Sequence, residues 1–481
     1  MPHAVPTPPS RDPCLPSTTN PIAYIDVFVD DFIALCQGEQ GEKQRVRQTL
    51  LHAVDKVFRP TDFYDSPSRR EPVSLKKLYK GDTSWSTIKH ILGWIIDTVS
   101  MTITLPPHRQ QRLGEILASI PPHQKQTSLR KWRKILGDLR SMSLALPGAR
   151  NLFSSMQHAL TLRNNHRIAL RTDVHAAIAD FKWLHNNISS RPTRIAELVP
   201  LNPCAIGYHD ASAQGAGGVW YCNPELTPRL NTLHCQPLLW RLQWPHDIIA
   251  NLVTADNPNG TITNSDLELA GGLIHLDIIA QHYDTRERTI LSNTDNLATL
   301  FWQRNGSATS NAVPAHLLRL FGIHQRYHRY VARHDYIPGL SNPMADSASR
   351  LFTLSHSQFL SHFNTHFPQK QSYKLVTPTS QMTSCMISAL RKKMSNGELP
   401  LVDPPPPIPI GQSGPSTPLH WASTPFSKPS KTKYQLSKSS FEEFELDKLQ
   451  PSNVRSSLGR LKTTYGLLPR RTLAWGPQTL G

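Results

Sequence analysis

Residues 204–222 read CAIGYHDASAQGAGGVWYC, and this stretch decides much of the fold. An apolar segment leads into Asp210, glycines follow at Gly215, Gly217 and Gly218, and a second apolar segment comes next. Glycine lets a chain reverse tightly. The pattern therefore predicts two strands joined by a glycine-rich turn, with Asp210 at the end of the first strand.

Three further acids follow at the ends of predicted elements. In NSDLELAGGLIHLDIIA, Glu268 lies in the first turn of a predicted helix that Asn264 or Ser265 would cap. In RTILSNTDNLATLFW, Asp295 ends an apolar strand just before a helix. In YIPGLSNPMADSASRLF, Asp346 begins a helix after a Pro-Gly turn. The alternation of short strands and helices predicts an α/β or α+β domain.

Each acid by itself also fits an ordinary structural role, as a turn residue or a helix cap. The joint order is more specific, because strand-Asp, helix-Glu, strand-Asp and helix-Asp is the order of the RNase H family. The strings HDAS-x-x-G-x-G, D-x-E-L, S-N-T-D-N and I-P-G-x-x-N-x-x-A-D-x-x-S-R resemble the RNase H of retrotransposons. The resemblance implies an RNase H-like domain over 201–355, with a mixed sheet of about five strands and helices packed on it.

The same resemblance implies a metal site. Four carboxylates in one pocket repel one another, and divalent cations remove that conflict. Mg²⁺ prefers oxygen ligands, and two Mg²⁺ or Mn²⁺ ions about 4 Å apart can activate a water and stabilise the leaving oxygen of a phosphodiester. By resemblance the ligands are Asp210, Glu268, Asp295 and Asp346, with Asp210 bridging both ions.

Many RNases H also use a histidine on a loop before the last acid. His324, His328 and His334 are candidates here. None of them has a spacing that matches the family, so we expect each to be a surface histidine.

Upstream, AYIDVFVDDFIAL is an apolar strand interrupted by Asp30 and Asp31. Adjacent acids inside such a strand are costly unless they form a turn and meet a metal. The string resembles the catalytic Y-x-D-D hairpin of reverse transcriptases, with Phe28 in the position of the tyrosine. The alternative is a hairpin tip with two solvated acids.

Two more segments resemble a reverse transcriptase of the DIRS-like or gypsy-like kind. KHILGWIIDTVSMTITLPPHRQQRL resembles the primer-grip hairpin, and TSLRKWRKILGDLRSMSLALPGARNLF resembles the thumb helices. We assign 21–110 to the rear of the palm and 111–200 to the thumb and connection. The thumb-like helix has one predicted apolar face, formed by Leu129, Trp132, Leu136 and Leu139. Its basic residues can reach phosphates; they are Arg130, Lys131, Arg133, Lys134 and Arg140.

One part of the polymerase pattern is missing. A reverse transcriptase needs another metal-binding Asp on an earlier strand and fingers that close on the nucleotide. Only the Pro-rich residues 1–20 precede the hairpin; their one acid, Asp12, lies in no strand, and Asp26 shares a strand with Asp30. We expect the polymerase half to be truncated and inactive alone.

Composition fits a nucleic-acid partner. Lys and Arg number 52 against 35 acids, a formal charge of +17, which favours polyanions. The 41 prolines gather at the ends of the chain, so we expect 1–20 and most of 356–481 to be disordered tails. Six scattered cysteines suit free thiols. With no apolar run of membrane-spanning length, we expect an intracellular protein of the cytoplasm or nucleus.

Two functions follow from these observations. The first is a hydrolase that cuts RNA in RNA–DNA hybrids, bound to a hybrid or a primed RNA template and possibly to other domains of its polyprotein. The alternative is a non-catalytic nucleic-acid-binding remnant of a decayed element. All four acids are present, which favours retained chemistry. The thumb-like region disfavours a cellular RNase H.

Overall fold

The computed structural model describes residues 23–28, 31–36, 38–58, 63–64, 84–162, 166–188, 190–222, 236–308 and 313–392. All of them belong to a unit spanning Met1–Ser423, and a second unit spans Thr424–Gly481. Asp30, the side chain of Asp31, the predicted tail 1–20 and residues 393–481 of the predicted tail 356–481 lie outside the described residues. Within the described ranges, no helix is long and apolar enough to cross a membrane.

The first described elements form a hairpin. Strands β1 (Ala23–Phe28) and β2 (Asp31–Cys36) pair antiparallel, with Phe28 opposite Asp31, and helix α1 (Gln40–Phe58) follows. The two strands flanking the predicted Asp30–Asp31 motif therefore pair with each other.

A small antiparallel sheet follows. Its strand order is β3-β4-β5-β8, with β3 (Ile88–Ile91), β4 (Trp94–Asp97), β5 (Thr102–Thr104) and β8 (Thr193–Arg194). Leu92 and Gly93 join β3 to β4 with φ angles of 50° and 81°, as a tight hairpin turn requires. Arg109 donates a hydrogen bond to the Gly93 carbonyl at 2.7 Å. The hairpin predicted around residues 92–94 is therefore present.

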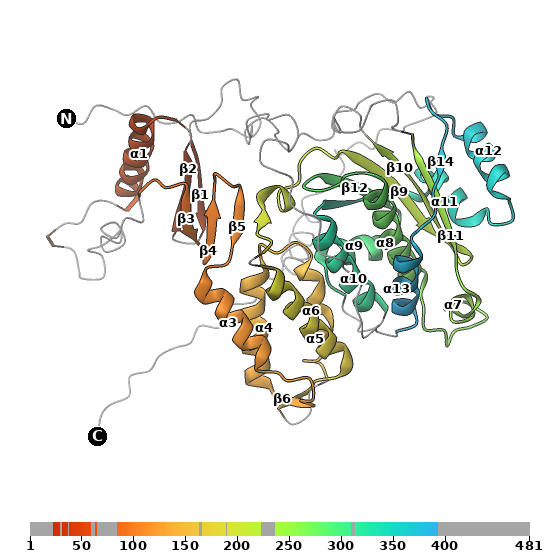
Figure 1. Cartoon of the computed structure of the whole chain (residues 1–481), viewed down its shortest axis with the longest axis horizontal. Coiled ribbons are helices and arrows are strands. Elements are labelled where there is room, and N and C mark those ends of the chain that lie inside the picture. Colours follow the sequence, from red (N-terminus) through yellow and green to blue (C-terminus); the bar gives the residue numbers. More distant parts are fainter. Residues whose placement is uncertain are drawn as a thin grey trace, which may run out of the picture. The chain divides into compact units, whose positions relative to one another are not determined.

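Helices form the next region (Figure 1). They are α3 (Pro107–Ala118), α4 (Leu129–Ser143), α5 (Phe153–His158) and α6 (Thr172–Ile188), with 3-10 turns η2 (Ala149–Leu152) and η3 (Ile195–Glu197) and a strand pair β6 (Gln126–Ser128) and β7 (Arg167–Ala169). Trp132 is fully buried, and its indole N–H donates to the Met156 carbonyl at 3.0 Å. Leu136 and Leu139 are buried beside it as predicted, whereas Leu129, the first residue of α4, is only partly buried.

A mixed sheet of six strands is the largest element (Figure 1). Its order is β13-β12-β9-β10-β11-β14, with β9 (Ala205–Ala211), β10 (Gly215–Cys222), β11 (Leu238–Gln243), β12 (Thr289–Thr294), β13 (Val331–Tyr336) and β14 (Lys374–Leu375). β9, β10 and β11 pair antiparallel, and β12 runs parallel to β9 and to β13. The predicted mixed sheet is thus present with one additional strand.

Both faces of this sheet are covered. One core joins Trp220 and Trp240 to helices α7 (His246–Ala250), α8 (Asn264–His282), α9 (Leu297–Asn305), α10 (Val313–His328) and α13 (Ser380–Leu390). The other joins Val219 and Leu239 to α11 (Pro343–Arg350) and α12 (His356–His366). Because neighbouring strand residues point to opposite faces, β10 and β11 contribute side chains to both cores.

The predicted domain end at 355 is wrong, because the chain remains folded to residue 392. Phe359 and Phe363 of α12 are fully buried against the sheet, and Met386 of α13 is buried against α8 and α10. The polar residues around these few apolar positions resemble a tail in composition. The apolar residues of α12 are nevertheless buried, because they pack against the face of the sheet that carries Val219 and Leu239.

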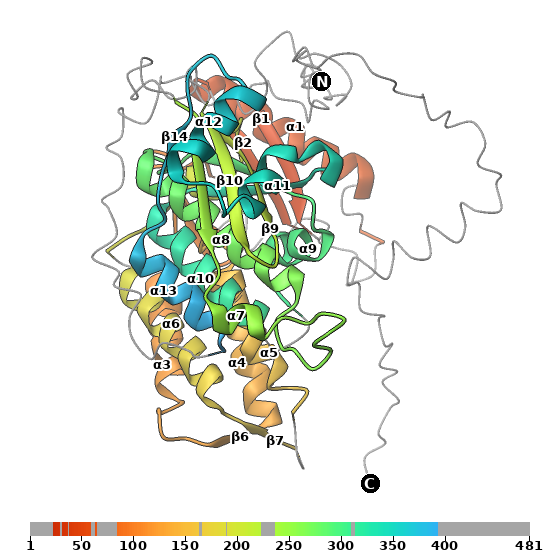
Figure 2. The ribbon, with the colours of Figure 1, turned by 90° about the vertical axis from the view of Figure 1, so that its right-hand side faces the viewer.

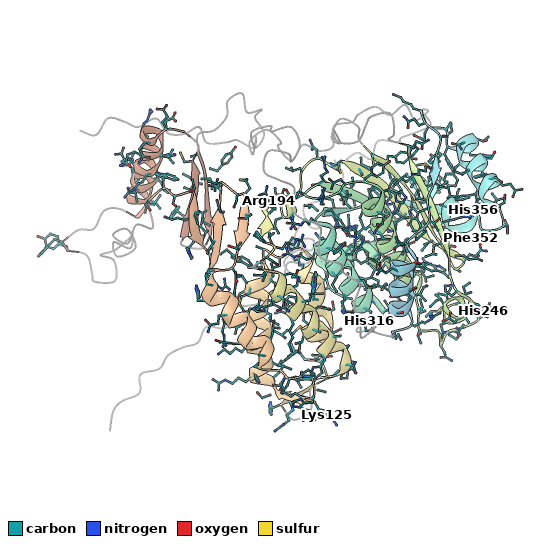
Figure 3. The ribbon with its side chains drawn as sticks, viewed as in Figure 1. Lys125, Arg194, His246, His316, Phe352 and His356 are labelled. Carbon is teal, nitrogen blue, oxygen red and sulfur yellow. The ribbon has the colours of Figure 1, made fainter. Side chains whose placement is uncertain are left out.

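A group of buried charges connects the helical region to the sheet region. Arg194, labelled in Figure 3, lies 3.6 Å from Glu287, and Arg191 pairs with Glu197 at 2.8 Å. Arg329 also lies 3.7 Å from Glu287. Residues near 190–197 are therefore packed against the start of β12 and the end of α10. Cys204 and Cys385 are free thiols, and Cys204 is buried.

Candidate active site

Three of the four predicted acids meet where β9, β12 and α8 come together; these elements are labelled in Figure 1. Asp210 stands at the penultimate position of the central strand β9, and Asp295 directly follows β12, which lies beside β9. Glu268 is in the second turn of α8. Each contributes a carboxylate oxygen, and these oxygens all lie within 4.8 Å of one another.

Helix α8 presents Glu268 through a cap that the sequence analysis placed wrongly. Thr263, and not Asn264 or Ser265, is the N-cap: its hydroxyl accepts from the Asp266 N–H at 3.3 Å. Asp266 accepts in return from the Thr263 N–H at 2.7 Å. In the string D-x-E-L, Asp266 therefore holds the helix end and leaves Glu268 free to face the other acids.

The three carboxylates oppose one another's ionisation. Burial, followed by the charge of Asp210 and a hydrogen bond to it, raises the pKa of Glu268 well above its usual value. Burial, followed by the charge of Asp210, also raises the pKa of Asp295. Among the described residues, the Glu268 Oε2 atom has no hydrogen-bond partner although it is buried. An orphaned buried oxygen beside two other acid oxygens fits a hard divalent cation such as Mg²⁺ or Mn²⁺.

The fourth acid lies at the edge of this group. Asp346 of α11 accepts a hydrogen bond from Arg350 at 2.7 Å, and its side chain is 49% exposed. Its negative charge also contributes to the raised pKa of Asp295, so it acts on the group electrostatically. The structure therefore brings Asp210, Glu268 and Asp295 together and leaves Asp346 paired with Arg350 beside them.

The glycines of β10 serve a different purpose from the predicted turn. Gly215, Gly217 and Gly218 all lie within the strand. A Cβ on Gly217 would stand 2.4 Å from the backbone of Ala348, because α11 crosses the strand there. The missing side chain lets α11 approach β9 and β10 closely.

This close approach introduces a residue that the sequence analysis missed. Ser349 of α11 is fully buried, and its hydroxyl donates to the Asp210 Oδ2 atom at 2.5 Å. Asn342, before the same helix, donates to the His209 carbonyl at 3.2 Å. Both residues belong to the string N-x-x-A-D-x-x-S-R. The sequence contained these residues, but their contacts with β9 are visible only in the structure.

The histidine prediction is wrong for His324, which is buried at 2% exposure. His324 lies on the buried face of α10, and its Nε2 atom is 3.3 Å from the Asp277 Oδ1 atom and not beside the three acids. His328 and His334 are half-buried.

The basic side chains of α4 lie on its outer face. Arg130, Arg133 and Lys134 are exposed. Lys131 is exposed as well and donates to the Ser119 carbonyl at 2.9 Å, while Arg140 lies 5.9 Å from the Phe153 ring centroid. The exposed face therefore presents a row of cations beside a buried apolar stripe.

No protein-family model and no curated protein matches this sequence. Among solved structures, the foamy viral protease-reverse transcriptase dRH in complex with ds DNA has a TM-score of 0.29 and 11% identity, covering 65% of this chain and 46% of that chain. The foamy viral protease-reverse transcriptase in complex with RNA/DNA hybrid has a TM-score of 0.26 and 13% identity, covering 66% and 36%. This chain thus spans about half the length of those proteins or less, and a likeness at this level does not establish a shared fold.

Proposed function

We propose that residues 201–392 form an RNase H-type nuclease that hydrolyses the RNA strand of RNA–DNA hybrids with the help of divalent metal ions. We further propose that it belongs to a reverse transcriptase of a DIRS-like or gypsy-like retrotransposon. The single observation that carries the proposal is the convergence of the Asp210, Glu268 and Asp295 carboxylates. The mixed strand order around them supports it.

The residues divide the work. Asp210, held by the Ser349 hydroxyl, would be the central ligand of such ions, and Glu268 and Asp295 would supply the other buried carboxylates. Asp346, the outer acid, would add a fourth carboxylate to these ligands if it were released from Arg350. Bound divalent cations would supply charge neutralisation and an activated water. In the proposed hydrolysis the water oxygen would bond to phosphorus while the bond to the 3′ oxygen breaks. One proton of the water would pass to the leaving 3′ oxygen, so the products would be a 5′-phosphate and a 3′-hydroxyl.

The test is cleavage of a labelled RNA–DNA hybrid by the full chain with Mg²⁺ or Mn²⁺. Asp295→Asn keeps the size of the side chain but weakens metal binding, so it should remove most of the cleavage. Asp256→Asn, on an exposed loop, is the matched control and should cleave like the parent. Equal cleavage by Asp295→Asn and the parent would overturn the proposal. A parent that binds the hybrid without cutting it would favour the non-catalytic alternative.

We also propose that the exposed cations of α4 form ion pairs with phosphates of the bound hybrid. Removing one cation that pairs with a phosphate lowers the slope of log affinity against log salt by about 1. Lys134→Ala should therefore weaken hybrid binding at low salt and reduce this slope. Lys370→Ala, exposed beside β14, should change neither. An unchanged slope for Lys134→Ala would place the hybrid elsewhere.

A further inference from the structure

A second cluster of ligand-type side chains lies further along α8, apart from the candidate active site. Asp277 of α8 faces His324 and His328 of α10, and one ligand atom from each lies within 4.8 Å of the other two. At 1.5 Å per residue, Asp277 is about 13 Å along the helix from Glu268. Helices α8, α10 and α13 pack together at this point (Figure 2).

From this geometry we infer a zinc-binding site formed by Asp277, His324 and His328. The two histidines are four residues apart on one helix, so both rings lie on the same face. Imidazole nitrogens together with one carboxylate suit Zn²⁺, whereas Mg²⁺ prefers an all-oxygen set. The site would tie α10 to α8, and through Thr379 it would also reach α13.

The distance between His324 and Asp277 suits a shared ion as well as the hydrogen bond seen between them. The His324 Nε2 and Asp277 Oδ1 atoms are 3.3 Å apart. A hydrogen bond between a charged imidazole and a carboxylate is usually about 2.7–2.9 Å long. Two ligand atoms that each lie about 2.0–2.1 Å from a tetrahedral zinc are about 3.3 Å apart.

The surrounding hydrogen bonds orient the ligands as metal sites require. The other His324 ring nitrogen, Nδ1, lies 2.8 Å from the Tyr330 hydroxyl. The other Asp277 oxygen, Oδ2, accepts from the Thr379 hydroxyl at 2.9 Å. Ligating histidines and carboxylates usually have such partners on the side away from the metal. The His328 ring lies beside the His324 ring, with 4.2 Å between their centroids.

A direct titration tests the site. The full chain is titrated with Zn²⁺ in the presence of excess Mg²⁺, which saturates the oxygen-only acid cluster. We expect one tight Zn²⁺ site and a rise in melting temperature that a zinc-selective chelator reverses. His328→Ala should weaken this binding by roughly 100-fold or more, and Thr379→Val, which removes only the hydrogen bond to Asp277, by roughly 10- to 100-fold.

The histidine pair on α12 provides a matched control. His362 and His366 share the same helical spacing, and their rings stack at 4.2 Å, but no carboxylate completes them into a three-ligand group among the described residues. His366→Ala should leave the tight site unchanged. Loss of binding in His366→Ala but not in His328→Ala would overturn the inference. So would the absence of tight Zn²⁺ binding by the parent chain. If His328→Ala does not fold by circular dichroism, Thr379→Val and the chelator experiment decide.

Discussion

Two of the buried acids of helix α8, Glu268 and Asp277, lie in opposite electrostatic surroundings. Glu268 faces two other carboxylates, and burial and the charge of Asp210 raise its pKa. Asp277 faces histidines; burial opposes its ionisation, yet hydrogen bonds from His324 and Thr379 hold its pKa below the usual value. Glu268 therefore has only like charges beside it, whereas Asp277 has hydrogen-bond donors. Burial alone does not define a reactive acid; its neighbours do.

The largest expected difference between the two acids is in hydrolysis. Glu268→Gln keeps the shape of the side chain but removes the negative charge, so cleavage of the hybrid should fall by 100-fold or more, since even the outer partners of metal ligands are worth roughly 10- to 100-fold. The folded structure should survive, because an amide in this place no longer repels Asp210. Circular dichroism and the cleavage rate, measured on the same sample, check both statements. A variant that cleaves like the parent would remove Glu268 from the site.

The next difference is in stability. Asp277→Ala leaves His324 and Thr379 without their buried partner, and breaking a buried pair in this way costs on the order of 3–5 kcal/mol. Asp335→Ala, which breaks the exposed pair with Arg304, should cost no more than about 1 kcal/mol. Urea denaturation of both variants in zinc-free buffer gives the two free energies of unfolding. Equal costs would show that Asp277 is not tightly held.

Much of this contrast follows from sequence, and part of it does not. Asp210 and Asp295 were predictable because each ends an apolar strand, and adjacent strand ends meet at one edge of a sheet. Asp346 was placed on the right helix, but its pairing with Arg350 depends on a rotamer that spacing does not specify. The pairing of His324 with Asp277 joins two helices and has no local signal.

The extent of the sheet region was also beyond sequence reasoning. Helix α12 contributes Phe359 and Phe363 to a face of the sheet that appears only once β10 and β11 have paired. Its polar composition therefore resembled a tail. The buried stripe of α4 was mostly predictable because a long helix with regular spacing carries its own pattern.

Glu268 and Asp277 should also change the stability of the protein with pH in opposite directions. Because the pKa of Glu268 is raised, the folded metal-free protein holds this proton more tightly than the unfolded chain. The resulting stability is present below about pH 4.3 and is lost as pH rises through the folded pKa. Glu268→Gln should therefore gain stability relative to the parent as pH rises from about 4 to 7, by about 1.4 kcal/mol for each unit by which the two pKa values differ. Mg²⁺ should reduce this gain, because it neutralises the parent's carboxylates.

The difference between variant and parent is the right quantity, because burial also lowers the pKa of His328 to about 3 and that of His334 to about 4. A histidine kept neutral in this way loses stability as pH falls below about 6.5, in both proteins alike. Asp277 contributes in the opposite sense to Glu268, since its lowered pKa makes its stability present above about pH 3.9 and lost at lower pH. Melting temperatures of the two proteins across this range, without metal, provide the measurement. A difference that does not grow with pH would contradict the assigned strain at Glu268.

The smallest expected effect concerns the hydroxyl groups that orient each acid. Ser349 donates to Asp210 at 2.5 Å, just as Thr379 donates to Asp277 at 2.9 Å. Without the hydroxyl, the Asp210 carboxylate can rotate and lose part of its preference for the metal-binding orientation, so Ser349→Ala should raise the Mg²⁺ concentration for half-maximal cleavage by roughly 10-fold. Ser347→Ala is the matched control on the same helix, because its hydroxyl makes no hydrogen bond to any described residue. If the rate at saturating Mg²⁺ recovers in Ser349→Ala, the serine positions a ligand. If the rate stays low at every Mg²⁺ concentration, the hydroxyl acts on the reaction itself, and the parallel between the two clusters fails at this hydrogen bond.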